Sequence, residues 1–125
     1  MNSDTGGDAI QARLRLALRA ALKTKDTVAA SALRSVLAAI SNAEAVPPHP
    51  GTTPVASQHV AGGAAGLGSA EAERKILSRQ ETARIIEDEI FERRAAIRQY
   101  EAVGRPELAE RLRHEIQVIQ SAAQA

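Results

Sequence analysis

The acidic residues in the second half of the chain are the first candidates for chemistry. Two carboxylates can act as general acid and general base when both reach one substrate atom. Consecutive residues of an α-helix, however, point about 100° apart, so neighbouring carboxylates on a helix diverge. We therefore interpret the acidic run as a solvated helix face and assign it no catalytic residue. The run consists of Glu87, Asp88, Glu89 and Glu92.

The three histidines also lack the partners that a metal site or a catalytic site needs. His49 and His59 lie in a stretch, residues 46–69, that contains no carboxylate, so a full set of metal ligands is missing there. His114 follows Glu110 by four residues, a spacing that favours a surface pair. The chain has no cysteine and no motif of a phosphate-binding loop, a nucleophile elbow or a zinc protease. We expect no catalytic residue, no metal and no cofactor.

One arginine and one glutamate occupy positions where apolar residues are expected. Arg93 falls on the apolar stripe of a predicted helix, and Glu115 falls on the stripe of the next one. The Gly-Arg-Pro breaker at residues 104–106 predicts an antiparallel hairpin in which the two side chains lie nearly level. We predict a partly buried salt bridge between Arg93 and Glu115, which Glu89 joins from one turn away. The first of the two stripes consists of Ile86, Ile90, Ile97 and Tyr100.

This polar cluster of Glu89, Arg93 and Glu115 has two interpretations. One is a charged functional site inside the hairpin, and the other is an ion pair that fixes the register of the two helices. No neighbouring nucleophile or set of metal ligands accompanies the pair, and the pattern favours the structural interpretation.

Helical periodicity and capping residues predict four helices and no strands. Ser78 and Glu81 form a capping box at the start of the longest helix, and Asp26 or Thr27 caps the second. With one Phe and one Tyr, the core must be built from Ala, Leu, Ile and Val. We predict an all-α fold, a small helical bundle with a long antiparallel C-terminal helical hairpin. The helices are expected at residues 8–25, 27–45, 79–103 and 106–121.

Two segments are expected to lie outside this bundle. Residues 46–69 hold four of the five prolines and five of the eight glycines. Such a composition cannot bury enough apolar surface to offset the entropy of ordering. We predict a flexible mid-chain insertion there and a disordered N-terminus over residues 1–7. Residues 8–125 are then a single helical domain that the insertion interrupts.

The first helix carries the one basic face that the sequence reveals. No acidic residue occurs over residues 9–25, and cations on one helix face can follow a phosphate backbone. Because no aromatic residue accompanies them, any binding of RNA should be sequence-tolerant and salt-sensitive. The alternative is a solvated face that keeps the chain soluble. The net charge of the chain, +1, is compatible with this alternative. The RNA-binding candidates are Arg13, Arg15, Arg19 and Lys23.

The second helix is the most apolar, with charges only at Arg34 and Glu44. A helix of this kind lies at the centre of a bundle or at a contact between chains. It supports a different hypothesis of function, in which the chain is an all-helical protein-interaction or homodimerisation module with no RNA role.

Two segments carry a family resemblance. LKTKDTVAASALRSVLAAISNAE spans residues 22–44, and ETARIIEDEIFERRAAIRQYEAVGRPELAERLRHEIQVI spans residues 81–119. Together they resemble the GatB/YqeY family, stand-alone proteins related to the C-terminal region of the B subunit of glutamine-dependent Asp/Glu-tRNA amidotransferase. The resemblance implies an all-helical bundle and a family label of carbon-nitrogen ligase with glutamine as amido-N-donor. In the family a helical tail domain follows, which the related subunit associates with tRNA, whereas this sequence ends after QVIQSAAQA.

These observations lead to one main expectation and one alternative. We expect a YqeY-like helical accessory module in a tRNA amidotransferase context, non-catalytic by itself, with tRNA as a candidate partner. In the alternative, the partner is another protein or a second copy, held through the second helix. The sequence has no signal peptide and no apolar stretch near the roughly 20 residues of a membrane span, so we expect a cytoplasmic protein without a membrane partner.

Overall fold

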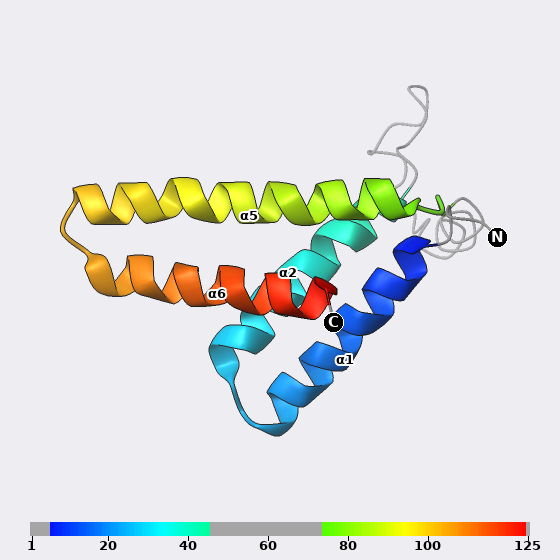
Figure 1. Ribbon diagram of the computed structural model, residues 1–125, viewed down its shortest axis with the longest axis horizontal. Helices are drawn as coiled ribbons and strands as arrows, with labels where there is room; N and C mark the ends of the chain where they lie inside the picture. Colours follow the sequence, from blue (N-terminus) through cyan, green and yellow to red (C-terminus); the bar gives the residue numbers. More distant parts are fainter. Residues whose placement is uncertain (1–5, 46–73, 125) are drawn as a thin grey trace, which may run out of the picture. The chain divides into compact units, whose positions relative to one another are not determined.

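The computed structural model describes residues 6–45 and 74–124, which form four helices and contain no strand (Figure 1). The predicted all-α fold is confirmed for this part of the chain. The expected insertion at residues 46–69 lies outside the described residues, as do residues 1–5. The helices are α1 (Gly6–Lys23), α2 (Thr27–Glu44), α5 (Arg79–Ala102) and α6 (Pro106–Gln124).

The longest helix, α5, begins at the predicted capping box. The Ser78 hydroxyl accepts a hydrogen bond from the backbone N–H of Glu81 at 3.0 Å. In return, the Glu81 carboxylate accepts one from the backbone N–H of Ser78 at 2.9 Å. These bonds satisfy two donors that a helix start would otherwise leave open, and so they fix where α5 begins.

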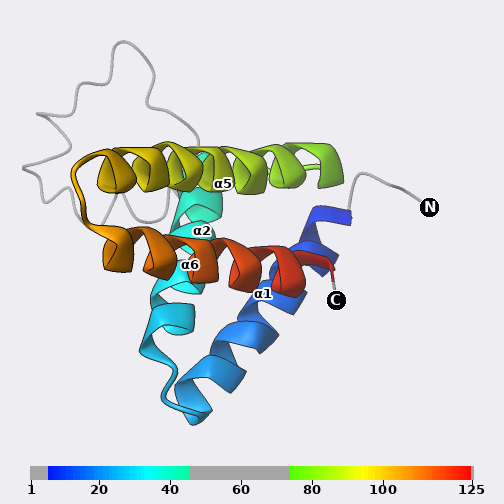
Figure 2. The same cartoon turned by 60° about the vertical axis from the view of Figure 1, so that its left-hand side comes forward.

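The turn between α5 and α6 folds the chain into the predicted hairpin, and both views show the two helices side by side and antiparallel (Figures 1 and 2). Gly104 has φ +75°, in the left-handed region. Its N–H donates to the Glu101 carbonyl at 3.2 Å, and the Arg105 N–H donates to the Tyr100 carbonyl at 2.8 Å. This pair of bonds is a Schellman motif, which ends a helix and satisfies its last carbonyls.

The core lies where α1 and α2 meet the hairpin. Helix α1 packs against both α5 and α6, and α2 contacts α5 through a hydrogen bond between Ser35 and Glu89. Tyr100, predicted to lie on the buried stripe, is instead exposed at 36%, because it lies at the turn end of the hairpin, which α1 does not reach (Figures 1 and 2). The largest fully buried side chains are Leu14, Leu33, Ile40, Ile119, Val36 and Thr82.

Helix α1 begins at Gly6, two residues before the predicted start at residue 8, because two glycines allow its first turn to press against the start of α5. A Cβ at Gly7 would lie 2.6 Å from Thr82 Oγ1 and 2.8 Å from the Leu77 carbonyl oxygen. A Cβ at Gly6 would lie 2.8 Å from Arg79 Cβ. The sequence pattern suggested disorder for Gly6 and Gly7, but both residues belong to α1.

A short turn joins α1 to α2 through a second Schellman motif. The Lys25 N–H donates to the Leu22 carbonyl at 3.2 Å, and the Asp26 N–H donates to the Ala21 carbonyl at 2.9 Å. Lys25 therefore takes the left-handed position, with φ 60°, a conformation that costs a non-glycine residue free energy. Asp26, one of the two predicted caps, accepts a hydrogen bond from the Ala29 N–H at 3.1 Å and starts α2.

The chain divides into two compact units, Met1–Ile40 with Leu77–Ala125, and Ser41–Ile76. The polar network of the hairpin and the outward face of α1, described below, belong to the first unit. In the second unit, Glu44 at the end of α2 forms an ion pair with Arg74, and its carbonyl accepts a hydrogen bond from the Lys75 N–H at 2.7 Å. The prediction of a single domain over residues 8–125 stays a prediction.

Candidate functional site

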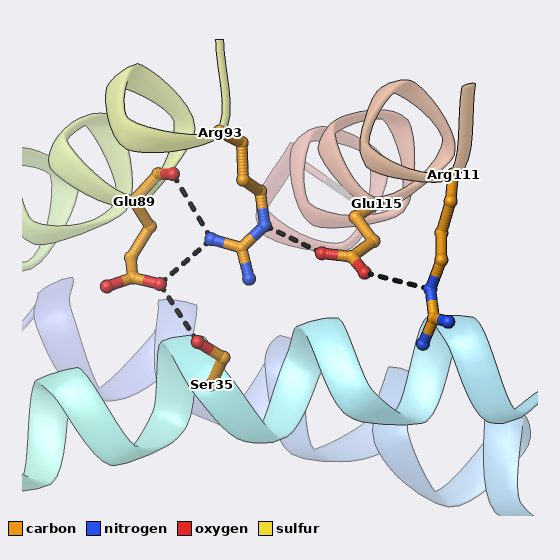
Figure 3. A network of polar contacts seen from close by, with 5 residues as sticks. All are labelled: Ser35, Glu89, Arg93, Arg111 and Glu115. Carbon is orange, nitrogen blue, oxygen red and sulfur yellow. Dashed lines mark hydrogen bonds and ion pairs between the residues drawn. The ribbon is translucent and has the colours of Figure 1, made fainter. Parts of the chain in front are cut away.

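A polar network runs through the hairpin at the place where the sequence puts charges on the apolar stripes (Figure 3). Arg93 Nε donates to Glu115 Oε1 at 2.9 Å, which is the predicted salt bridge. Arg93 Nη1 donates to Glu89 Oε1 at 2.9 Å and to the Glu89 carbonyl oxygen at 3.1 Å. One guanidinium therefore holds two carboxylates, one from each helix of the hairpin.

Two further residues extend the network beyond the predicted three. The Ser35 hydroxyl of α2 donates to Glu89 Oε1 at 3.0 Å, and Arg111 Nε lies 3.6 Å from Glu115 Oε2. Arg111 precedes Glu115 by four residues, so helical spacing alone could have revealed it. Ser35 could not be found in this way, because its contact depends on where α2 lies against the hairpin.

The network is mostly shielded from solvent. The side chains of Arg93, Glu89 and Glu115 are 12%, 17% and 11% exposed, whereas the Arg111 side chain is 53% exposed. The two arginines balance the two glutamates, so the whole network carries no net charge, but its three shielded side chains together carry a charge of −1. A buried pair of this kind is strongly destabilised when one partner is removed, since the other charge is left without compensation.

This arrangement suits a structural role better than catalysis. Both carboxylates are occupied by guanidinium groups, and no histidine or lysine lies in the network to activate the Ser35 hydroxyl. The ion pair requires one register of α6 against α5, because a shift by one residue would carry Glu115 about 100° around its helix.

The basic residues of α1 do not all share one face. Arg13 Nε and Nη2 both donate to the Ala123 carbonyl, at 3.1 and 2.8 Å, so Arg13 clamps the end of α6. Two residues further along, Arg15 lies about 200° around the helix and faces outward. Its Nη2 donates to Gln11 Oε1 at 3.0 Å. Of the four RNA-binding candidates, Arg15, Arg19 and Lys23 are exposed, and Arg13 is turned towards α6.

Two exposed leucines lie among these outward cations. Leu16 is 64% exposed and Leu22 is 46% exposed. They border a shallow hollow of about 610 Å³, which Arg19, Ala20 and Lys23 also line. We define the outward face of α1 as Arg15, Leu16, Arg19, Leu22 and Lys23.

Helix α2 offers no comparable surface. Leu33, Val36 and Ile40 are at most 1% exposed, so its apolar arc is used inside the fold. The expected apolar contact surface on α2 is therefore absent from the described residues, and the hypothesis of a protein contact moves to α1. In the described part of the chain, the exposed large apolar residues are Leu16, Leu22, Ile76, Phe91, Tyr100 and Val103.

The turn end of the hairpin is held by exposed ion pairs. The Arg105 guanidinium donates to Glu107 at 2.9 Å and lowers the pKa of that carboxyl below its usual value. Hydrogen bonds to Glu101 and Glu110 raise the pKa of Arg113. Glu110 thus pairs with Arg113, at 3.2 Å, rather than with His114.

Residues 6–45 and 74–124 show neither a cluster of metal ligands nor a membrane-spanning helix. Within these ranges, no group of three His, Asp or Glu side chains is placed to hold a metal ion. None of the helices there is both long and apolar enough to cross a bilayer. His49 and His59 lie outside the described residues.

The hairpin also carries the match to known proteins. Residues 64–122 match the family model of the Yqey-like proteins. This stretch is similar to the Yqey-like proteins and is called the YqeY-like domain below. It takes in α5 and most of α6, and therefore Glu89, Arg93 and Glu115, whereas α1 and α2 lie outside the matched residues. No curated protein and no solved structure matches the chain.

Proposed function

We propose that the chain is a non-catalytic helical accessory module in the context of glutamine-dependent tRNA amidotransferase, and that the outward face of α1 binds a partner protein. The observation that carries this proposal is the exposure of Leu16 and Leu22 beside Arg19 and Lys23. The amidotransferase context comes from the YqeY-like domain and from the resemblance of the sequence to the GatB/YqeY family.

The chemistry of the face indicates what kind of partner fits. Exposed leucines gain free energy when a partner covers them, and cations around an apolar patch select negatively charged surfaces. The matching surface is an acidic amphipathic helix, whose apolar side covers the leucines while its carboxylates meet Arg15, Arg19 and Lys23.

A contact with tRNA through the same face is the second candidate. Its support is the run without acidic residues over 9–25, which leaves Arg15, Arg19 and Lys23 free of carboxylate neighbours along the helix. Three phosphate contacts predict a slope of roughly −2 to −3 for the logarithm of affinity against the logarithm of salt concentration. Loss of the leucines should barely change such binding.

One set of variants separates the two candidates. The chain is titrated in a calorimeter with a purified glutamine-dependent tRNA amidotransferase and, separately, with bulk tRNA. For a protein contact, the double variant Leu16→Ser/Leu22→Ser should weaken binding to the enzyme at least about tenfold, because two buried apolar contacts are lost. The control Val103→Ser changes another exposed apolar residue, 69% exposed at the turn of the hairpin, and should leave the affinity unchanged.

Other results would select the RNA candidate or contradict the proposal. Binding to tRNA that survives the leucine changes but disappears in Arg15→Glu/Arg19→Glu/Lys23→Glu would select the RNA candidate. Binding to neither would contradict both. Glutamine-dependent amide formation by the purified chain alone would overturn the non-catalytic role.

A further inference from the structure

A second hollow lies on the hairpin itself, inside the YqeY-like domain and away from the outward face of α1. It measures about 340 Å³ and is formed by residues of both α5 and α6. Three arginines and two isoleucines line it, with no acidic residue among them. The lining residues are Arg94, Ile97, Arg98, Arg113 and Ile116.

Two of these arginines have no counter-charge in the described part of the chain. Arg94 and Arg98 are exposed, one helical turn apart on α5, and neither makes a hydrogen bond or an ion pair with a described residue. Like charges at this spacing oppose helix formation. Neither burial nor pairing within the described residues accounts for the two cations at these positions.

The third arginine comes from the facing helix and is held in place. Arg113 is paired with Glu101 on α5 and with Glu110 on α6. These two carboxylates engage Nη2 and Nη1 of the guanidinium, and Nε makes no bond to a described residue. Ile97 and Ile116, each 8% exposed, form an apolar floor between the helices.

We infer that this hollow binds the phosphate group of a ligand, with Arg94 and Arg98 as the main contacts and Arg113 as a third contact from α6. A guanidinium presents a planar fork of N–H donors that matches two oxygens of a phosphate. Arginines from two antiparallel helices approach the group from different sides, which a single cationic helix face does not achieve. The isoleucine floor offers apolar surface to the part of the ligand next to the phosphate.

A phosphate can come from a free small molecule or from a nucleic-acid backbone, and the test separates these sources. The ¹⁵N-labelled chain is titrated with inorganic phosphate, with a nucleoside monophosphate and with a short single-stranded RNA, at constant ionic strength set by chloride. The amide signals of residues 94, 98 and 113 should shift in at least one of the three titrations. The variants Arg94→Gln and Arg98→Gln should each weaken that binding about tenfold, since each removes a charge-assisted contact.

A matched control distinguishes the hollow from general attraction of anions. Arg84→Gln removes another exposed arginine of α5 that does not line the hollow, and it should leave the affinity unchanged. Equal weakening by Arg84→Gln, or no shift of these amides with any of the three ligands, would overturn the inference.

The set of ligands that bind identifies the source of the phosphate. One variant also tests whether this site is independent of the proposed α1 interface. Shifts with phosphate or the monophosphate indicate a small ligand, and shifts with RNA alone indicate a backbone. The variant Leu16→Ser/Leu22→Ser should bind phosphate as the wild type does. If the proposed α1 interface is contradicted, the phosphate site can therefore still be supported. In the same way, the loss of the phosphate site would not contradict the α1 interface.

Discussion

At the scale of single residues, the most informative feature is one guanidinium that two carboxylates share. Arg93 joins Glu89 to Glu115, and exposure of all three side chains is below 20%. In such a site, removing one partner lowers the free energy of unfolding by more than the ion pair itself contributes to it, because the remaining charges stay buried.

We predict that Arg93→Ala lowers the free energy of unfolding by about 3 kcal/mol, since Glu89 and Glu115 lose the buried counter-charge that they share. The control is Arg111→Ala, which removes the exposed partner of the same Glu115 and should cost less than about 1 kcal/mol. Urea denaturation measures both. Equal losses in the two variants would show that the burial of Arg93 has no energetic consequence.

The pKa of Glu107 offers a second test at this scale. Because the hydrogen bond from Arg105 lowers this pKa in the folded chain, the pair stabilises the fold above the unfolded pKa of Glu107. This stabilisation is lost as the pH falls through the folded pKa. In Arg105→Gln, the pKa of Glu107 should rise towards its ordinary value, as followed by NMR of the carboxyl carbon. An unchanged titration curve would mean that the pair does not form in solution.

At the scale of the helices, the hydrogen bonds that end α1 and α5 decide which residue takes the left-handed conformation. The two Schellman motifs make the same hydrogen bonds, but one places Gly104 and the other places Lys25 in the left-handed conformation. Glycine adopts that conformation without the steric cost that a side chain brings.

We therefore predict opposite effects for substitutions at the two left-handed positions. Lys25→Gly should raise the free energy of unfolding by up to about 1 kcal/mol, and Gly104→Ala should lower it by about 1 kcal/mol. No heavy atom lies within 4 Å of a Cβ at Gly104, so its backbone conformation alone would cause the loss. Thermal unfolding of the two variants measures both changes in stability. Changes of the same sign would contradict the prediction.

The start of α1 gives a prediction whose sign is decisive. Helix propensity alone would make Gly7→Ala stabilising by about 1 kcal/mol. The collision of the new Cβ with Thr82 and Leu77 should reverse this and destabilise the chain by about 1–3 kcal/mol. A stabilised variant in chemical denaturation would show that α1 does not approach α5 this closely.

The elements also show which features the sequence could predict. The capping box, the Gly-Arg-Pro turn and the pairing of Arg93 with Glu115 follow from local spacing, and the structure contains all three. The roles of Gly7, Arg13 and Ser35 depend on where α1 and α2 lie against the hairpin, and helical periodicity does not contain that information. For this reason, the sequence predicted disorder at Gly7 and an RNA contact for Arg13.

At the scale of the whole molecule, the proposals concern two surfaces within residues 6–45 and 74–124. The hairpin carries an arginine-lined hollow within the YqeY-like domain. The outward face of α1 carries exposed leucines among cations and lies outside the residues that match the family. These exposed leucines shift the preferred partner of α1 from RNA to protein.

Hydrogen–deuterium exchange of the chain, alone and with a purified glutamine-dependent tRNA amidotransferase, tests the proposed interface most directly. If α1 binds the enzyme, peptides covering residues 15–23 should exchange more slowly in the mixture, and this protection should be absent in Leu16→Ser/Leu22→Ser. Protection confined to the hairpin, or no protection anywhere, would contradict a docking role for α1.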